Sequence, residues 1–203
     1  MNLIRVTIMP PSDTKSKKTP GGQSWLDAAM KILSEEGFQT LNIPRLCRKL
    51  HLTKGSFYHH FKSFEAFKKQ LLSFWEKDFT QDIFDEIKGV EDPEAQYEML
   101  FNLAFEKDLA IDLAIRAWAQ TDNQVKDVVT KVDEIRISLL TEMYQKSSNL
   151  PLEAARNYAV IDYTGYIGFY SLFPDAPDSW ARDLASIQTR ALLSDSKVTR
   201  GQI

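Results

Sequence analysis

Residues 52–61 read LTKGSFYHHF, which places a lysine, a glycine, a serine, a tyrosine and two adjacent histidines between apolar anchors. Metal sites, catalytic sites and nucleic-acid surfaces all use such side chains. If the segment is helical, Phe57 and Phe61 lie four residues apart on one side and face the core. The opposite side then presents a polar surface formed by Gly55, Ser56, Tyr58, His59 and Lys62.

A second short helix is expected directly before this segment. Asn42 is a favourable N-cap and Pro44 falls in the first turn, so a helix is predicted over residues 42–50. Thr53 can cap the next helix over 53–62, and only His51 and Leu52 separate the two. Two short helices joined by so tight a turn are typical of a helix-turn-helix, whose second helix enters the major groove of DNA.

The polar side of the 53–62 helix suits a DNA backbone. Gly55 has no side chain, so the backbone can approach the duplex closely. The hydroxyls of Thr53 and Ser56, with the free N–H groups of the first turn, can bind phosphate. Lys54 and Lys62 supply positive charge. We therefore expect this surface to contact phosphates.

Tyr58 and the histidines extend the same surface. Tyr58 offers a phenol to a phosphate and a ring to a thymine methyl, and His59 or His60 can donate to phosphate or base. The alternative is a metal site that uses His51, His59 and His60, the three histidines of the chain. Adjacent histidines on a helix diverge by about 100°, which disfavours one shared ion. We expect no metal.

Charge is distributed unevenly along the 203 residues. Residues 1–70 hold twelve Lys/Arg and five Asp/Glu, a net charge of +7, whereas the remainder holds thirteen and twenty-three, a net charge of −10. A basic first third favours contact with a polyanion, although uneven solvation charge is an alternative. The single cysteine, Cys47, excludes an intramolecular disulfide and lies on a predicted apolar face, where a core role is expected.

Several other classes of protein find no support. No apolar run approaches the roughly 20 residues that span a bilayer, and the start MNLIRVTIMPPSD is too broken for a secretory signal. Cytoplasmic residence is expected. The glycine-rich phosphate loop, the G-x-S-x-G elbow and the H-E-x-x-H motif are all missing, so we expect neither an enzyme nor a cofactor.

The periodicity predicts an all-α fold in which a three-helix N-terminal helix-turn-helix domain precedes a larger helical domain for ligand binding and dimerisation. Residues 1–22 contain KSKK and end in PGG, which indicates a flexible basic arm. The DNA-binding domain is expected over 23–62 and the ligand and dimerisation domain over 63–203. Within the latter, helices are predicted at 63–88, 93–107, 109–119, 122–147, 151–173 and 178–193.

Aromatic residues recur at helical spacing through the larger domain. Most are expected to form the core, but several can line an apolar pocket between helices. Arg116 can pair with an anionic ligand or with Asp112 at i−4. The candidates for ligand binding are Trp75, Phe79, Phe105, Trp118, Tyr144, Tyr163 and Tyr166.

Four segments between Trp25 and Leu71 carry a resemblance to a known family: LDAAMKIL, EEGF, NIPRLCRKL and LTKGSFYHHFKSFEAF. This part of the chain resembles the DNA-binding domain of the TetR family of transcriptional regulators. The family pattern T-x-G-x-x-Y-x-H-F falls on Thr53, Gly55, Tyr58, His60 and Phe61. His51 stands where a glycine is usual in the turn, so a left-handed backbone is expected there.

The resemblance implies a ligand-responsive regulator, most simply a repressor, that binds a palindromic operator as a homodimer through 151–173 and 178–193. A small apolar or aromatic molecule would be the effector. A helical ligand-binding or scaffold protein with non-specific or lost DNA binding stays open as an alternative. By position, the resemblance implies DNA contacts from Thr53, Lys54, Ser56, Tyr58, His59 and His60, with Arg45 and Lys62 as weaker candidates.

Overall fold

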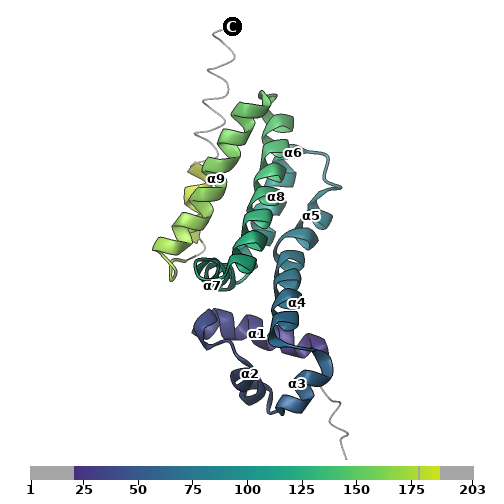
Figure 1. Cartoon of the computed structure of the whole chain (residues 1–203). Coiled ribbons are helices and arrows are strands. Elements are labelled where there is room, and N and C mark those ends of the chain that lie inside the picture. The colour runs from purple at the N-terminus through teal and green to yellow at the C-terminus, as the bar shows by residue number, and fades with distance from the viewer. Residues whose placement is uncertain (1–20, 178, 188–203) are drawn as a thin grey trace, which may run out of the picture.

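The computed structural model describes residues 21–177 and 179–187, and every regular element within these residues is helical (Figure 1). The expected all-α fold is confirmed. Residues 179–187 are also helical, within the helix expected at 178–193. The elements are α1 (Gly22–Glu36), η1 (Phe38–Thr40), α2 (Ile43–Leu50), α3 (Lys54–His60), α4 (Phe64–Glu76), η2 (Lys77–Gln81), α5 (Asp82–Ile87), α6 (Pro93–Phe105), α7 (Leu109–Ala119), α8 (Asn123–Ser148) and α9 (Leu152–Leu172).

The helices form a small group at one end and a longer bundle above it (Figure 1). Helices α1, α2 and α3 make the small group, and α4 rises from it along one side of the molecule. Helix α7 packs on both α1 and α8, so it joins the two parts, while α8 packs along α9 and α6. None of the described helices is long and apolar enough to cross a membrane.

Side chains in the sequence fix where the short helices begin. Asn42 accepts a hydrogen bond from the backbone N–H of Arg45 at 2.9 Å, and Thr53 accepts one from Ser56 at 3.2 Å. Each cap satisfies a backbone donor that a helix start leaves unpaired. Both predicted caps are confirmed, and aspartates or serine cap the later helices in the same way at Ser63, Asp92, Asp108 and Asp122.

The turn between α2 and α3 depends on a left-handed residue. His51 has φ 54° and ψ 40°, and its N–H donates to the carbonyl of Arg48 at 3.3 Å. The next N–H, of Leu52, donates to Cys47 at 2.9 Å. These two bonds end α2 and turn the chain sharply into α3. The expected left-handed backbone is confirmed, with an imidazole where glycine would be less strained.

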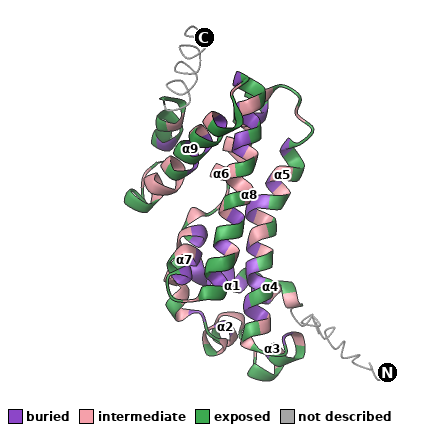
Figure 2. Cartoon of the chain, turned by 45° about the horizontal axis from the view of Figure 1, so that its top comes forward, coloured by how far each residue is buried: buried purple, intermediate pink, exposed green. Residues whose placement is uncertain are grey.

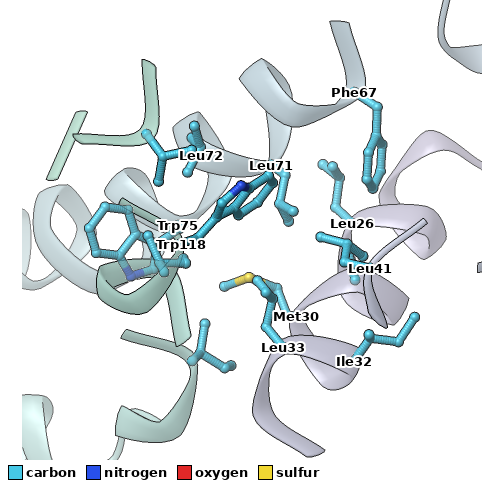
Figure 3. Packing of buried hydrophobic residues seen from close by; sticks show 14 of the residues in the cluster. Leu26, Met30, Ile32, Leu33, Leu41, Phe67, Leu71, Leu72, Trp75 and Trp118 are labelled. Atoms are coloured by element: carbon cyan, nitrogen blue, oxygen red, sulfur yellow. The ribbon is translucent and has the colours of Figure 1, made fainter. Parts of the chain in front are cut away.

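A continuous apolar core joins α1 and α3 to α4 and α7. Trp25, Phe57 and Phe67 are fully buried, and the ring of Phe57 lies 5.3 Å from Trp25 and 5.4 Å from Phe67. Figure 3 shows Trp75 of α4 and Trp118 of α7 in the same cluster, close to the side chains that α1 contributes. The core is therefore shared between the helix-turn-helix and the bundle. Because the core is closely packed, a displacement of α4 or α7 also displaces α1.

The helix predicted over 63–88 is helical over 64–87, but it is not uniform. Residues Lys77–Gln81 form a π-helical segment between α4 and α5, which the sequence did not reveal. Such segments are rare, and they appear frequently at functional sites. The basic arm expected over 1–22 lies outside the described residues except for its last two positions, as do residues 188–193 of the final predicted helix.

Replacing His51 with glycine is expected to stabilise the protein. Glycine adopts the left-handed conformation without steric cost, and His51 is exposed, so little packing is lost. Since glycine also makes the unfolded chain more flexible, the gain in the free energy of unfolding should be about 0.5–1 kcal/mol. Urea unfolding would measure it, with His51→Ala as the control expected to lose stability. A glycine variant no more stable than wild type would show that the turn is unstrained.

Candidate functional site

Helix α3 presents a polar face to solvent and an apolar face to the core. Phe57 and Phe61 are buried, as the helical projection predicted, whereas Tyr58 is 53% exposed (Figure 2). The Tyr58 ring lies against Phe57 at 5.5 Å, so its base is anchored while most of its surface faces outward. The exposed positions around it are Thr53, Lys54, Gly55, His59 and Lys62, and Ser56 is half-buried.

The remaining candidates for DNA contact are less accessible. His60 packs its ring 6.2 Å from Phe61, and its Nε2 atom is buried without a hydrogen-bond partner in the described part of the chain. Arg45 is paired within the chain, because its Nε donates to Glu36 of α1 at 2.8 Å and its Nη2 binds the other oxygen of the same carboxylate. Arg45 thus ties α2 to α1 in this structure.

A cavity of about 100 Å³ lies in the bundle between η2, α5, α6, α7, α8 and α9. Of the seven aromatic candidates, Phe79, Tyr163 and Tyr166 line it. Its other polar lining residues are Thr80, Tyr97, Lys107, Asp112, Arg136 and Asp162. Its other apolar lining residues are Ile83, Phe84, Leu100, Phe101, Ala104, Leu109, Leu139 and Leu140.

The other four aromatic candidates lie outside the cavity lining. Trp75 and Trp118 belong to the core shared with α1. Phe105 packs 4.4 Å from Phe101, which does line the cavity. Tyr144 is buried behind Asp162 and donates its hydroxyl to that carboxylate at 3.2 Å.

Four charged residues form a buried ion network beside the cavity: Asp112, Arg116, Asp133 and Arg136. Asp112 is fully buried and accepts from Arg116 at 2.7 Å and from Arg136 at 3.0 Å. Arg116 also binds Asp133, with contacts of 3.0 and 2.6 Å. The hydroxyl of Tyr163 reaches both arginines and donates to Asp133 at 2.6 Å. Of the two pairings left open for Arg116, the one with Asp112 is the one observed.

Arg136 also connects the network to η2. Its Nε donates to the Thr80 hydroxyl at 3.0 Å, and its Nη2 donates to the Phe79 carbonyl at 3.3 Å. Lys107 holds the same segment from the other side, since its Nζ donates to Asp78 at 2.9 Å. Both groups that bind η2 therefore also line the cavity.

Burial and charge act in opposite directions within the network. Burial alone would raise the pKa of Asp112, but Arg136 and Arg116 outweigh it and hold that pKa below its usual value. Burial raises the pKa of the Tyr163 hydroxyl to about 12 despite both arginines. At neutral pH the aspartate is therefore ionised and the tyrosine is protonated, which is the pattern that the hydrogen bonds require.

Asp162 behaves differently, because among residues 21–177 and 179–187 no cation forms an ion pair with it. Its Oδ2 accepts from the hydroxyls of Tyr97 at 2.9 Å and Tyr144 at 3.2 Å. Burial raises the pKa of the Asp162 carboxyl, although these two hydrogen bonds partly offset the effect. The cavity lining therefore contains two members of the ion network and a more weakly acidic carboxyl.

Asp112, Arg136 and Asp162 were not predicted as site residues. A signal existed, because Asp112 and Asp162 interrupt apolar runs (LAIDLAI and AVIDYTG), and charged residues are almost never fully buried unless paired. The sequence did not indicate their partners, since Arg136 lies twenty-four residues beyond Asp112.

Comparisons with known proteins agree with this architecture. Residues 26–71 match the family model of bacterial regulatory proteins, tetR family. The chain is 45% identical over 51 residues to the transposon Tn10 TetC protein of Escherichia coli, which covers 25% of this chain and 24% of that protein. It is 28% identical over 138 residues to the HTH-type transcriptional repressor KstR2 of Rhodococcus jostii (strain RHA1), which covers 66% of this chain and 63% of that protein.

The likeness therefore spans less than two thirds of either curated relative. It extends across the fold in a solved structure, the transcriptional regulator FadR from Bacillus subtilis in complex with stearoyl-CoA. That structure has a TM-score of 0.61 and 17% sequence identity, and the match covers 85% of this chain and 97% of the other. The helix-turn-helix segment therefore matches the tetR family of bacterial regulatory proteins, and the chain shares the helical fold of the FadR structure.

Proposed function

We propose that this protein is a ligand-responsive transcriptional repressor that binds a palindromic DNA operator as a homodimer. The observation that carries the proposal is the outward face of α3, where Tyr58 and Lys54 are exposed over a fully buried Phe57. Because the inner face of α3 is packed in the core, the helix can enter a major groove without rearranging that core. We infer repression rather than activation from the relative KstR2, whose name states that role.

The exposed residues around Tyr58 are suited to phosphate contacts at the edge of the groove. Thr53 uses its oxygen to cap α3, which leaves its hydroxyl hydrogen to donate to phosphate. Lys54 and Lys62 are exposed at the two ends of the helix. We assign DNA contacts to these residues together with Gly55, Ser56, Tyr58 and His59, and weaker roles to Arg45 and His60.

The dimer interface is proposed on α9 and the helical residues 179–187. Of the nine large hydrophobic side chains exposed in the described chain, seven lie there, Phe173 directly follows α9, and the ninth is Tyr58. Such a concentration marks a surface that another molecule covers. A second copy is favoured because a palindromic site requires two recognition helices about 34–36 Å apart. The eight are Leu152, Val160, Ile161, Leu172, Phe173, Trp180, Leu184 and Ile187.

We propose the cavity as the effector site, since its occupant would touch the segment that controls α4. Phe79 and Thr80 of η2 line it, and so do Lys107 and Arg136, which hold η2 in place. Asp112, also in the lining, lies on α7, which packs on α1. A ligand that alters these contacts would bias α4 and α7 together, and with them the spacing of the two recognition helices.

A ligand shifts that equilibrium only as far as its affinities for the two states differ. The stearoyl-CoA is bound to FadR, and a sequence identity of 17% supports only a shared fold with this chain. We therefore argue the ligand from this chain's own cavity, which suits a small apolar or aromatic effector.

Tyr58→Phe and Lys54→Ala are expected to weaken operator binding, each by about tenfold in a dimer that loses two contacts. Fluorescence anisotropy on an operator selected from a random duplex library would measure the affinities. Lys88→Ala removes an exposed lysine at the end of α5, away from α3 (Figure 1), and serves as the matched control.

Wild-type affinity in both α3 variants would remove this face from the proposal. Retention of DNA without any enriched sequence, together with steep salt dependence, would favour the alternative of a helical protein that grips phosphates without reading bases. Far-UV circular dichroism of each variant separates these outcomes from loss of the fold.

Ile161→Asp is expected to convert the proposed dimer into a 23.3 kDa monomer. Ile161 is 50% exposed on α9, so an aspartate there costs the single chain little but would place an unpaired charge in the interface. Sedimentation velocity would report the mass, and Lys126→Asp on an exposed position of α8 is the control. An unchanged mass for Ile161→Asp would place the interface elsewhere.

A further inference from the structure

The size of the cavity limits the ligand that this conformation can take. Its volume of about 100 Å³ is below the roughly 150 Å³ of an engineered apolar cavity that holds benzene. It is also well below the roughly 300 Å³ at which pockets for drug-sized molecules begin. A single ring or a short chain therefore approaches the limit of what fits without opening the bundle.

The ionised groups around the cavity already balance each other. Lys107 is paired with Asp78 at 2.9 Å. Arg136 and Asp112 belong to the buried ion network, which contains two arginines and two aspartates and is therefore neutral as a whole. No cation among the lining residues is left to neutralise a negatively charged ligand.

The fourth charged residue of the lining, Asp162, does not change this balance in favour of a charged ligand. It faces tyrosine hydroxyls rather than a cation, and burial raises the pKa of its carboxyl. A carboxylate ligand beside it would add like charge. A neutral hydroxyl can instead donate a hydrogen bond to this carboxylate or accept one from its protonated form.

A charged ligand would therefore have to break the Arg136–Asp112 pair or the Lys107–Asp78 pair to find a partner. Burying an unpaired ion costs several kcal/mol even after the protein relaxes. A carboxylate could reach Arg136 only by competing with Asp112, which is fully buried and has nowhere to be solvated. An uncharged molecule meets neither cost and still gains from the apolar walls.

We propose that the effector is an uncharged, mainly apolar molecule of about one-ring size, whose oxygen atom is hydrogen-bonded to Asp162 in the cavity lining. This inference rests on the proposed ligand-responsive function and specifies the ligand class for its site. Discrimination against an anion of the same skeleton comes from the charge balance of the network and not from shape.

Benzyl alcohol and benzoate are a matched pair of probes for the full-length protein. We expect benzyl alcohol to bind at least about tenfold more tightly at neutral pH, because benzoate brings an unpaired charge. Ligand-observed NMR titration at millimolar concentrations measures both affinities without DNA. Release of operator DNA is then measured separately with the same probes.

Asp133→Asn tests the cause of the discrimination. Asp133 does not line the cavity and its side chain is 29% exposed, so its amide variant keeps the shape of the site while leaving the network with one excess positive charge. The preference for benzyl alcohol over benzoate should fall by about tenfold or reverse. Asp127→Asn, an exposed position on the same helix α8, is the control that should leave the preference unchanged.

Three results would overturn the inference: benzoate binding as tightly as benzyl alcohol to the wild type, neither probe binding, or an unchanged preference in a folded Asp133→Asn variant. Circular dichroism and urea unfolding establish that the variant is folded. If benzyl alcohol binds as expected but leaves the operator bound, the ligand class stands and the proposed ligand-responsive repression fails instead.

Discussion

The arrangement of the bundle depends on the buried charge of Asp112. This carboxylate is fully buried between two arginines, one on its own helix α7 and one on α8. Leaving either partner unpaired would cost several kcal/mol, so α7 and α8 cannot slide past one another independently. Since Arg136 also binds η2 and the Tyr163 hydroxyl of α9, one set of contacts fixes four elements around the cavity. The apolar side chains that line the cavity pack around this ion network.

The ion network also holds the π-helical segment η2 in place. A π-helical turn disturbs the regular i→i−4 ladder, and here Arg136 supplies a donor to the Phe79 carbonyl. The cavity lies beside this π-helical segment. Helix α4, which precedes it in the chain, packs in the core that contains residues of α1 and α3. Phe67 and Leu71 are fully buried in that core, so α4 cannot tilt without carrying the helix-turn-helix with it. A contiguous chain of packed and hydrogen-bonded groups therefore runs from the cavity to α3.

The sequence predicted those features that short-range interactions determine. Asn42 and Thr53 cap helices through bonds to residues three positions on, and His51 takes the left-handed turn that its place between two short helices demands. Periodicity correctly placed Phe57 inward. The position of the cavity could not be predicted from the sequence. Periodicity identifies which face of a helix is buried, but not where several buried faces leave a gap between them. Trp75 and Tyr163 carry the same helical signal, yet only Tyr163 reaches the cavity.

The buried ion network raises the question of why charge is kept in the bundle at all. Well-packed apolar residues in place of a buried ion pair are often as stabilising or more so. Stability alone therefore does not account for Asp112 and Arg136. An apolar pair of similar volume would hold α7 against α8 equally well, but it would leave the Thr80 hydroxyl and the Phe79 carbonyl of η2 without the donors that Arg136 supplies. Because Arg136 both lines the cavity and binds η2, we expect a ligand that contacts Arg136 to alter the position of η2. The function that we propose for the protein would need such a link between the cavity and the helix-turn-helix.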